Sequence, residues 1–142
     1  GNSAAAIGCI EGIRIIDKTS EITLISSEPY HTYSRPLISY LLLGKTDEQR
    51  MKYRPDGYYE KMGVVPMLGK KVLKIHAENK SLTLDGGQTI VYDKLLVATG
   101  SRPFVPPTAG MDSVEKKFTF LSLSDAKALG AAISPTSHRK LK

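Results

Sequence analysis

The apolar residues at the start of the chain change from helical to strand-like spacing. From Ala4 to about Ile16, isoleucines recur at the interval of one helix face. The run from Glu21 to Glu28 is rich in β-branched residues and ends in polar ones, which is typical of a buried parallel strand. A helix followed by such a strand is one half of a βαβ unit, so the pattern predicts an α/β fold.

Two short helices are predicted in the next stretch. A polar, tyrosine-rich loop, Pro29 to Pro36, separates them from the strand. Pro36 can open a helix because its φ is already fixed, and Gly44 can close one, so we expect a helix from Leu37 to about Leu43. Pro55 to Met62 is expected to form the second helix, which the following glycine ends.

After the second short helix the pattern becomes one of brief strands. Several of these runs alternate apolar with polar residues, and the turn signals Asn79-Lys80 and Asp85-Gly86-Gly87 lie between them. We therefore predict an antiparallel β-meander over about residues 64–92, lying across one face of the parallel sheet. Its expected strands are Val64–Leu68, Lys71–His76, Ser81–Leu84 and Thr89–Tyr92.

The last third of the chain is predicted to return to a buried strand and to end in a helix. Lys94 to Gly100 is an apolar run that ends in small residues, and a proline-rich loop follows it. A short strand is expected over Phe118–Leu123. Ser122 and Asp125 resemble a capping box with Asp in place of Glu, which would open a helix from about Asp125 to Ile133.

Composition and charge exclude several functional classes. The 142 residues, 41% of them hydrophobic, are enough for one globular domain with a core. The net charge is +6, but the basic residues are scattered, so we do not expect nucleic-acid binding. Apolar runs are too short to span a membrane. The single Cys9 rules out an internal disulfide framework and fits a reducing compartment, which predicts a cytoplasmic protein.

The first eight residues form a candidate phosphate-binding turn. They are small and lead directly into the predicted helix, whose free N–H groups and dipole favour an anion. Ser3 and Ala6 stand where a strict glycine motif has its second and third glycines, so the turn alone fits packing equally well. Such a turn normally follows a strand, and none precedes Gly1, so we expect a sheet that lacks its first strand.

Glu28 strengthens the nucleotide interpretation. It closes the predicted strand somewhat beyond the roughly 20 residues after the glycines at which a ribose-binding acid is expected. A carboxylate at this point accepts hydrogen bonds from ribose hydroxyls and repels a 2′-phosphate. A solvated glutamate at a strand end is the alternative.

Four segments together resemble a known family. They are Gly1–Ala5, Glu21–Glu28, Tyr33–Ser39 and Tyr92–Pro103. In this order, around a β-meander, they resemble the FAD-binding domain of the pyridine-nucleotide-disulfide oxidoreductase superfamily. Within it they are most similar to NAD(P)H-dependent flavoproteins that reduce rubredoxin and to the large subunit of assimilatory nitrite reductase. The likeness covers nearly the whole chain.

The resemblance implies a cofactor and a set of residues that hold it. The fold would be a three-layer FAD/NAD(P)-binding, Rossmann-like domain of parallel sheet, helices and meander. Residues 1–133 would form an incomplete FAD-binding domain, and 134–142 a polar tail or the start of a linker to an absent NAD(P)H domain. The turn would contact the FAD pyrophosphate, Glu28 the adenosine ribose, and the backbone of Val72 the adenine. The expected cofactor contacts are Gly1, Ser3, Ala4, Ala5, Glu28, Arg35, Pro36, Val72, Ala98, Thr99 and Gly100.

The resemblance also implies an activity. No cysteine lies between Leu37 and Leu43, where the thiol-using branches carry one, and Cys9 is expected to be an inert core thiol. The chain would therefore belong to an NAD(P)H-dependent flavin oxidoreductase that passes electrons to a small carrier protein or a fused redox domain. NAD(P)H would bind outside this chain. The resemblance leaves undecided whether the protein forms a homodimer. The alternatives are a non-catalytic nucleotide-binding or interaction module, and an NAD-binding domain.

Overall fold

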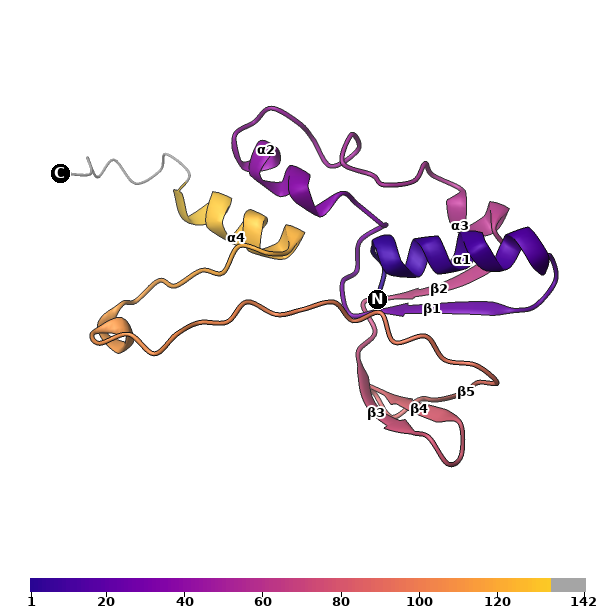
Figure 1. Ribbon diagram of the computed structural model, residues 1–142. Helices are drawn as coiled ribbons and strands as arrows, with labels where there is room; N and C mark the ends of the chain where they lie inside the picture. Colours follow the sequence, from indigo (N-terminus) through magenta and orange to yellow (C-terminus); the bar gives the residue numbers. More distant parts are fainter. Residues whose placement is uncertain (134–142) are drawn as a thin grey trace. The chain divides into compact units, whose positions relative to one another are not determined.

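The computed structural model describes residues 1–133, and the predicted tail, 134–142, lies outside the described residues. These residues form a mixed α/β structure with one parallel and one antiparallel sheet (Figure 1). They divide into two compact units. Unit 1 comprises 1–33 and 52–100, and unit 2 comprises 34–51 and the residues from 101 onward.

Unit 1 begins with the predicted helix and strand. Helix α1 is Ala4–Ile16 and strand β1 is Ile22–Ser26, so both are confirmed. The second short helix is also present, as α3, Tyr58–Lys61. Gly63 follows the end of this helix, and its φ of +57° is a conformation that glycine adopts without strain.

Strand β2, Val64–Leu68, was predicted to open the meander, and this prediction is wrong. It pairs with β1 in parallel, in a register that runs from Ile22 opposite Val64 to Ser26 opposite Leu68. Parallel strands need a long crossover connection, and residues 27–63 provide it. The meander therefore begins later than residue 64.

The core of unit 1 lies between its helices and the parallel sheet. Helix α1 runs along one face of β1 and β2 (Figure 1), and α3 packs against β2. The side chains that meet there are apolar or aromatic and almost fully buried. They are Ala6, Ile7, Ile10, Leu24, Tyr58, Tyr59 and Val64.

The meander consists of three antiparallel strands. They are β3 (Val72–His76), β4 (Ser81–Leu84) and β5 (Thr89–Val91), in the order β3-β4-β5. Ile75, Leu82 and Ile90 are cross-strand partners, so they share one face, and the row Lys74, Thr83 and Thr89 lies on the other. The register shifts between Val72 and Lys74, which marks a bulge at the start of β3.

The predicted strand from Lys94 to Gly100 is not formed. These residues have no regular structure, and Leu95, Leu96 and Val97 are exposed. A strand needs a neighbour that supplies ladder hydrogen bonds, and neither sheet of the described residues includes this segment. An apolar run alone predicted burial, but pairing decides whether it becomes a strand.

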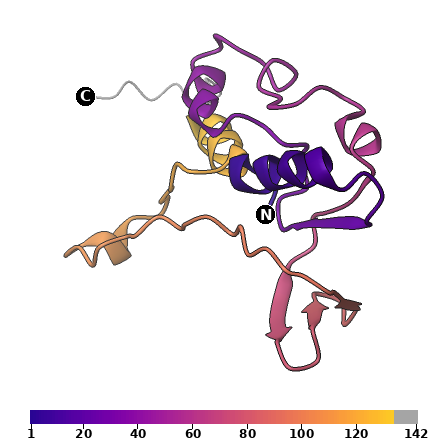
Figure 2. The ribbon, with the colours of Figure 1, turned by 45° about the vertical axis from the view of Figure 1, so that its right-hand side comes forward.

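Unit 2 holds the remaining helices. The predicted helix Leu37–Leu43 is split into a 3₁₀ turn η1 (Arg35–Leu37) and α2 (Ile38–Leu42), and a second 3₁₀ turn, η2, spans Met111–Ser113. Helix α4 is Leu123–Ile133 and lies beside α2 (Figures 1 and 2). Lys127 of α4 forms an ion pair with Glu48 at 2.9 Å.

The capping box at the start of α4 is confirmed, and it explains a wrong strand prediction. The Asp125 N–H donates to Ser122 Oγ at 3.1 Å, and Asp125 Oδ2 accepts from the N–H groups of Leu121 and Ser122 at 2.9 Å each. The N–H groups of Leu121 and Ser122 therefore donate to the cap and are not available for the ladder of a strand over Phe118–Leu123. No helix among the described residues is long and apolar enough to cross a membrane.

Candidate functional site

The opening turn presents the start of α1 without a cap from its own chain. Ser3 is the N-cap residue, yet its side chain makes no capping hydrogen bond, and the first turn contains no acidic residue. Ala4 and Ala5 are exposed. The first N–H groups of a helix have no intrahelical acceptor, so this end carries partial positive charge and donors that suit an anion.

Gly1 is needed for a close backbone approach. A Cβ at this position would lie 2.0 Å from the carbonyl oxygen of Ala98, a distance no side chain tolerates. The segment Ala98–Gly100 therefore passes directly against the opening turn, within unit 1. The structure brings together two of the sequence-predicted groups, the turn and Ala98, although it forms no strand there.

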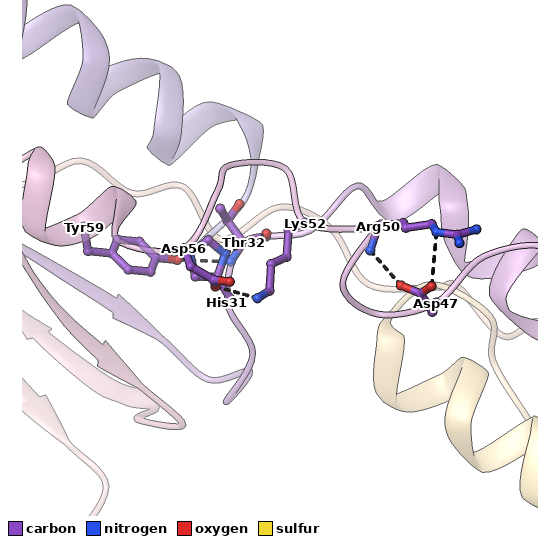
Figure 3. A network of polar contacts seen from close by, with 7 residues as sticks. All are labelled: His31, Thr32, Asp47, Arg50, Lys52, Asp56 and Tyr59. Atoms are coloured by element: carbon purple, nitrogen blue, oxygen red, sulfur yellow. Dashed lines mark hydrogen bonds and ion pairs between the residues drawn. The ribbon is translucent and has the colours of Figure 1, made fainter.

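Asn2 ties the turn to the loop after β1. Its Nδ2 donates to the carbonyl of Tyr30 at 3.1 Å, and its Oδ1 accepts from the Tyr59 hydroxyl at 2.9 Å. The Tyr59 oxygen in turn accepts from the N–H of Thr32 at 3.1 Å (Figure 3). One phenol of α3 thus holds both the turn and the loop.

His31 packs against this phenol and contacts a backbone carbonyl through its ring. Its ring centroid lies 4.9 Å from that of Tyr59, and its Nδ1 lies 3.1 Å from the carbonyl of Thr32. A carbonyl only accepts, so Nδ1 is the donor in this contact. His31 Nε2 and Thr32 Oγ1 are buried and lack a hydrogen-bond partner among the described residues.

Glu28 lies two residues beyond the end of β1, in the loop that Asn2 holds. Its carbonyl accepts from the N–H of Gly69 at 3.2 Å, and its Oε2 accepts from the Tyr33 hydroxyl at 2.6 Å. Glu28 is half-buried, whereas Tyr33 is buried. The candidate ribose acceptor is therefore fixed through both its main chain and its side chain.

Arg14 fixes the far end of α1 from inside the unit. It is only 9% exposed, and its guanidinium donates to four backbone carbonyls: Met62 at 2.7 Å, Asp17 at 3.1 Å, Ser20 at 2.8 Å and Gly63 at 3.1 Å. It thereby joins the end of α1, the approach to β1 and the turn before β2.

A second arginine acts on the exposed side of α1. Arg54 forms a bidentate ion pair with Glu11, at 2.7 and 3.0 Å, and this hydrogen bonding lowers the pKa of Glu11. Tyr58 donates to the same carboxylate over a longer distance, 3.4 Å. Burial raises the pKa of Tyr58 to about 12, and the Glu11 charge adds to the effect.

The other predicted site residues belong to several segments of the two units. Val72 is the first residue of β3, and Thr99 and Gly100 follow Ala98 at the end of unit 1. Arg35 and Pro36 belong to unit 2, where Arg35 Nη1 donates to the carbonyl of Leu121 at 3.4 Å. Cys9 is half-buried rather than in the core, because the buried face of α1 carries Ala6, Ile7, Ile10 and Arg14.

Sequence reasoning did not identify the supporting residues Asn2, Arg14, Tyr33 and Tyr59. Tyr59 is buried like an ordinary packing residue, but its hydroxyl also makes the contacts to Asn2 and Thr32. A usable signal existed in the sequence, because four tyrosines and a histidine lie close to Glu28 or in the second short helix. Among the described residues, no group of three or more His, Cys, Asp or Glu side chains could hold a metal ion.

A family model described as pyridine nucleotide-disulphide oxidoreductase matches residues 1–140. The chain belongs to this family. Its members are FAD- and NAD(P)H-dependent flavoproteins, so the family resemblance predicted from the sequence is confirmed.

Individual relatives cover nearly the whole chain but are much longer. The epsilon subunit of the NADH-dependent phenylglyoxylate dehydrogenase of Aromatoleum evansii is 32% identical over 94% of this chain and 32% of its own length. The nitrite reductase [NAD(P)H] of Bacillus subtilis is 34% identical over 79% of this chain and 14% of its own. The chain thus spans at most about a third of these relatives.

The fold is shared with solved reductases. The NADH:rubredoxin oxidoreductase from Clostridium acetobutylicum superposes with a TM-score of 0.78 over 92% of this chain and 33% of that one, at 24% sequence identity. This likeness supports the fold, a FAD/NAD(P)-binding α/β architecture.

Proposed function

We propose that this chain is the FAD-binding portion of an NAD(P)H-dependent flavin oxidoreductase. The observation that carries the proposal is the uncapped start of α1 in the same unit as Glu28 at the carboxyl end of β1. In open α/β sheets, ligands bind outside the carboxyl ends of the strands, with phosphates on a helix N-terminus.

The residues in unit 1 fit the two polar parts of FAD. The first N–H groups of α1, with Gly1, Ser3, Ala4 and Ala5, would bind the pyrophosphate, and Gly1 leaves no side chain in the way. Glu28 would accept hydrogen bonds from the adenosine ribose. Val72 would contact the adenine through its backbone, and Ala98, Thr99 and Gly100 would pass close to the cofactor.

Arg35 and Pro36 of unit 2 would contact the flavin part. A guanidinium is always charged and can fork onto phosphate or stabilise negative charge on a reduced flavin. When bound, FAD would accept hydride from the nicotinamide and pass electrons on to the acceptor, while the chain binds and orients the cofactor. The electron acceptor would be a small carrier protein, such as a rubredoxin or ferredoxin, or a fused nitrite reductase centre.

The first experiment measures FAD retention by the full-length protein. We expect a flavin absorption spectrum in the purified protein, and rebinding when FAD is added to apoprotein. A protein that stays colourless in excess FAD, with no thermal shift, would instead be a non-catalytic module. NAD competing with FAD for the same site in the titration would indicate the NAD-binding alternative.

Glu28→Ala tests the ribose assignment. The substitution removes the carboxylate acceptor, so FAD affinity should fall by roughly 10-fold, the equivalent of about 1.4 kcal/mol. Glu21→Ala is the matched control, because Glu21 is exposed just before the opposite end of β1. Equal FAD affinity in both variants would remove Glu28 from the site.

Cys9→Ser tests whether a thiol takes part in electron transfer. Cys9 is a half-buried, unpaired cysteine on α1. Turnover with NADH should be unchanged in the variant. Loss of turnover with normal flavin content would assign the thiol a role in the reaction.

A further inference from the structure

Tyr33 donates a hydrogen bond to Glu28 within the loop that follows β1. The hydroxyl lies 2.6 Å from Oε2, within the range of an O–H···O⁻ bond to an ionised carboxylate. Tyr33 is 7% exposed, so the donor itself is held in place. Nothing in the sequence pattern assigns it a role at the site.

Tyr33 is fixed from two further directions. Its backbone forms an antiparallel bridge with Lys52, and its ring meets Tyr30 edge-on at a centroid distance of 6.4 Å. Lys52 is itself paired with Asp56 at 2.5 Å (Figure 3). The phenol therefore has a defined position from which to orient a neighbour.

A glutamate carboxylate benefits from such an anchor. Its side chain has three rotatable bonds, and ordering it on binding costs conformational entropy. An ionised carboxylate has two oxygens that together accept about four hydrogen bonds, so it can accept from a tyrosine hydroxyl and from ribose hydroxyls at the same time. An acceptor already fixed in the free protein binds its ligand more tightly than one that must be ordered.

We propose that Tyr33 is the positioning residue for Glu28 and makes the site selective for a nucleotide with free ribose hydroxyls. The inference rests on the proposed function, because it takes Glu28 as the acceptor for the adenosine ribose of FAD. Tyr33 acts through Glu28 and does not itself contact the ribose.

The test is a double-mutant cycle on the full-length apoprotein with two ligands. The variants are Tyr33→Phe, Glu28→Gln and the double variant, and the ligands are FAD and an FAD analogue without the adenosine 2′- and 3′-hydroxyls. Affinity is measured by quenching of flavin fluorescence. Phe keeps the buried ring, and Tyr40→Phe, at a half-exposed tyrosine of α2, is the matched control.

Tyr33→Phe should weaken FAD binding by roughly 3- to 10-fold, and the effect should vanish in the Glu28→Gln background. It should also vanish for the dihydroxyl-free analogue in the otherwise wild-type protein. A merely structural role would lower the affinity for both ligands equally. That result, or additive losses in the double variant, would overturn the proposal.

The proposed function and the further inference fail in different ways. If the wild-type protein does not bind FAD, the proposed function fails. If it binds FAD and the analogue equally well, the ribose role of Glu28 fails, and that of Tyr33 with it. If FAD is preferred and Tyr33→Phe keeps the full preference, Glu28 retains its role and the positioning by Tyr33 is refuted.

Discussion

The two units hold their predicted cofactor residues in different ways. In unit 1, the side chains around the site bond to one another: Asn2 to Tyr59, and Glu28 to Tyr33. In unit 2, Arg35 donates to the carbonyl of Leu121 at 3.4 Å, and Pro36 is exposed. The two contacts of unit 1 are shorter and each comes from a buried tyrosine, whereas the Arg35 contact is longer and comes from a half-buried side chain.

This difference separates two kinds of binding residue. Where a buried network supports the binding groups, a mutation in the support should cost both folding stability and cofactor affinity. Where a charged side chain meets the ligand from an open surface, a mutation should cost affinity alone. The following changes test this contrast, in order of expected size.

Arg14→Met should destabilise the protein most. It keeps an apolar stem but leaves four backbone carbonyls without their donor, at a cost of about 3 kcal/mol, read as a lower thermal unfolding midpoint. The control is Arg50→Met in unit 2, where the side chain is 75% exposed and pairs with Asp47 (Figure 3). Similar losses in the two variants would contradict the contrast between the units.

Tyr59→Phe should have the next largest effect. The substitution leaves the N–H of fully buried Thr32 and the Oδ1 of Asn2 without the hydrogen bonds they make to the Tyr59 hydroxyl. The free energy of unfolding should fall by about 2 kcal/mol, and the opening turn should be held less firmly. FAD affinity should fall together with the unfolding midpoint. If only one of the two quantities moves, the turn and the loop are not coupled through this phenol.

Arg35→Lys should change binding without changing stability. It keeps the charge and loses the planar fork, so FAD affinity should fall by roughly 10-fold in the titration. The unfolding midpoint of the apoprotein should stay close to that of wild type, which corresponds to a change in unfolding free energy of about 0.5 kcal/mol or less, because Lys keeps the charge of this half-buried side chain. A marked drop in that midpoint would show that Arg35 supports the fold of unit 2.

The sequence was sufficient to predict elements that depend on local signals. The bounds of α1, the end of α3 before Gly63 and the capping box at Ser122 and Asp125 follow from periodicity, glycine and short polar motifs. The wrong predictions concern strand pairing. Nothing in Val64–Leu68 shows whether its partner is the neighbouring hairpin or β1, because either pairing buries the same apolar run.

The supporting network of the site was hidden for a related reason. Glu28 was recognisable because a strand-end acid at this spacing has a known use, whereas Tyr33 and Tyr59 are ordinary buried aromatics in sequence. Their hydroxyl partners lie 5 residues away for Tyr33 and 57 for the Asn2 contact of Tyr59. Such contacts depend on tertiary geometry, which single-residue patterns do not encode.

Tyr58→Phe should give the smallest loss of stability, and it is the matched control for Tyr59→Phe because both residues belong to α3. Both rings are buried on α3, but the Tyr58 hydroxyl reaches only the half-exposed Glu11 carboxylate, at 3.4 Å. At neutral pH the loss should be about 0.5 kcal/mol or less. A loss as large as that of Tyr59→Phe would mean that ring packing, not the Asn2–Thr32 network, dominates this side of the unit.

Alkaline pH separates the two tyrosines further. Burial raises the pKa of Tyr58 to about 12 from its ordinary 10, so the folded state holds the phenolic proton that the unfolded state releases. The stability from this difference is complete below pH 10 and is lost as the pH rises towards 12. Tyr58→Phe should therefore flatten the fall of the unfolding midpoint over this range, and an unchanged slope would show that Tyr58 titrates alike in both states.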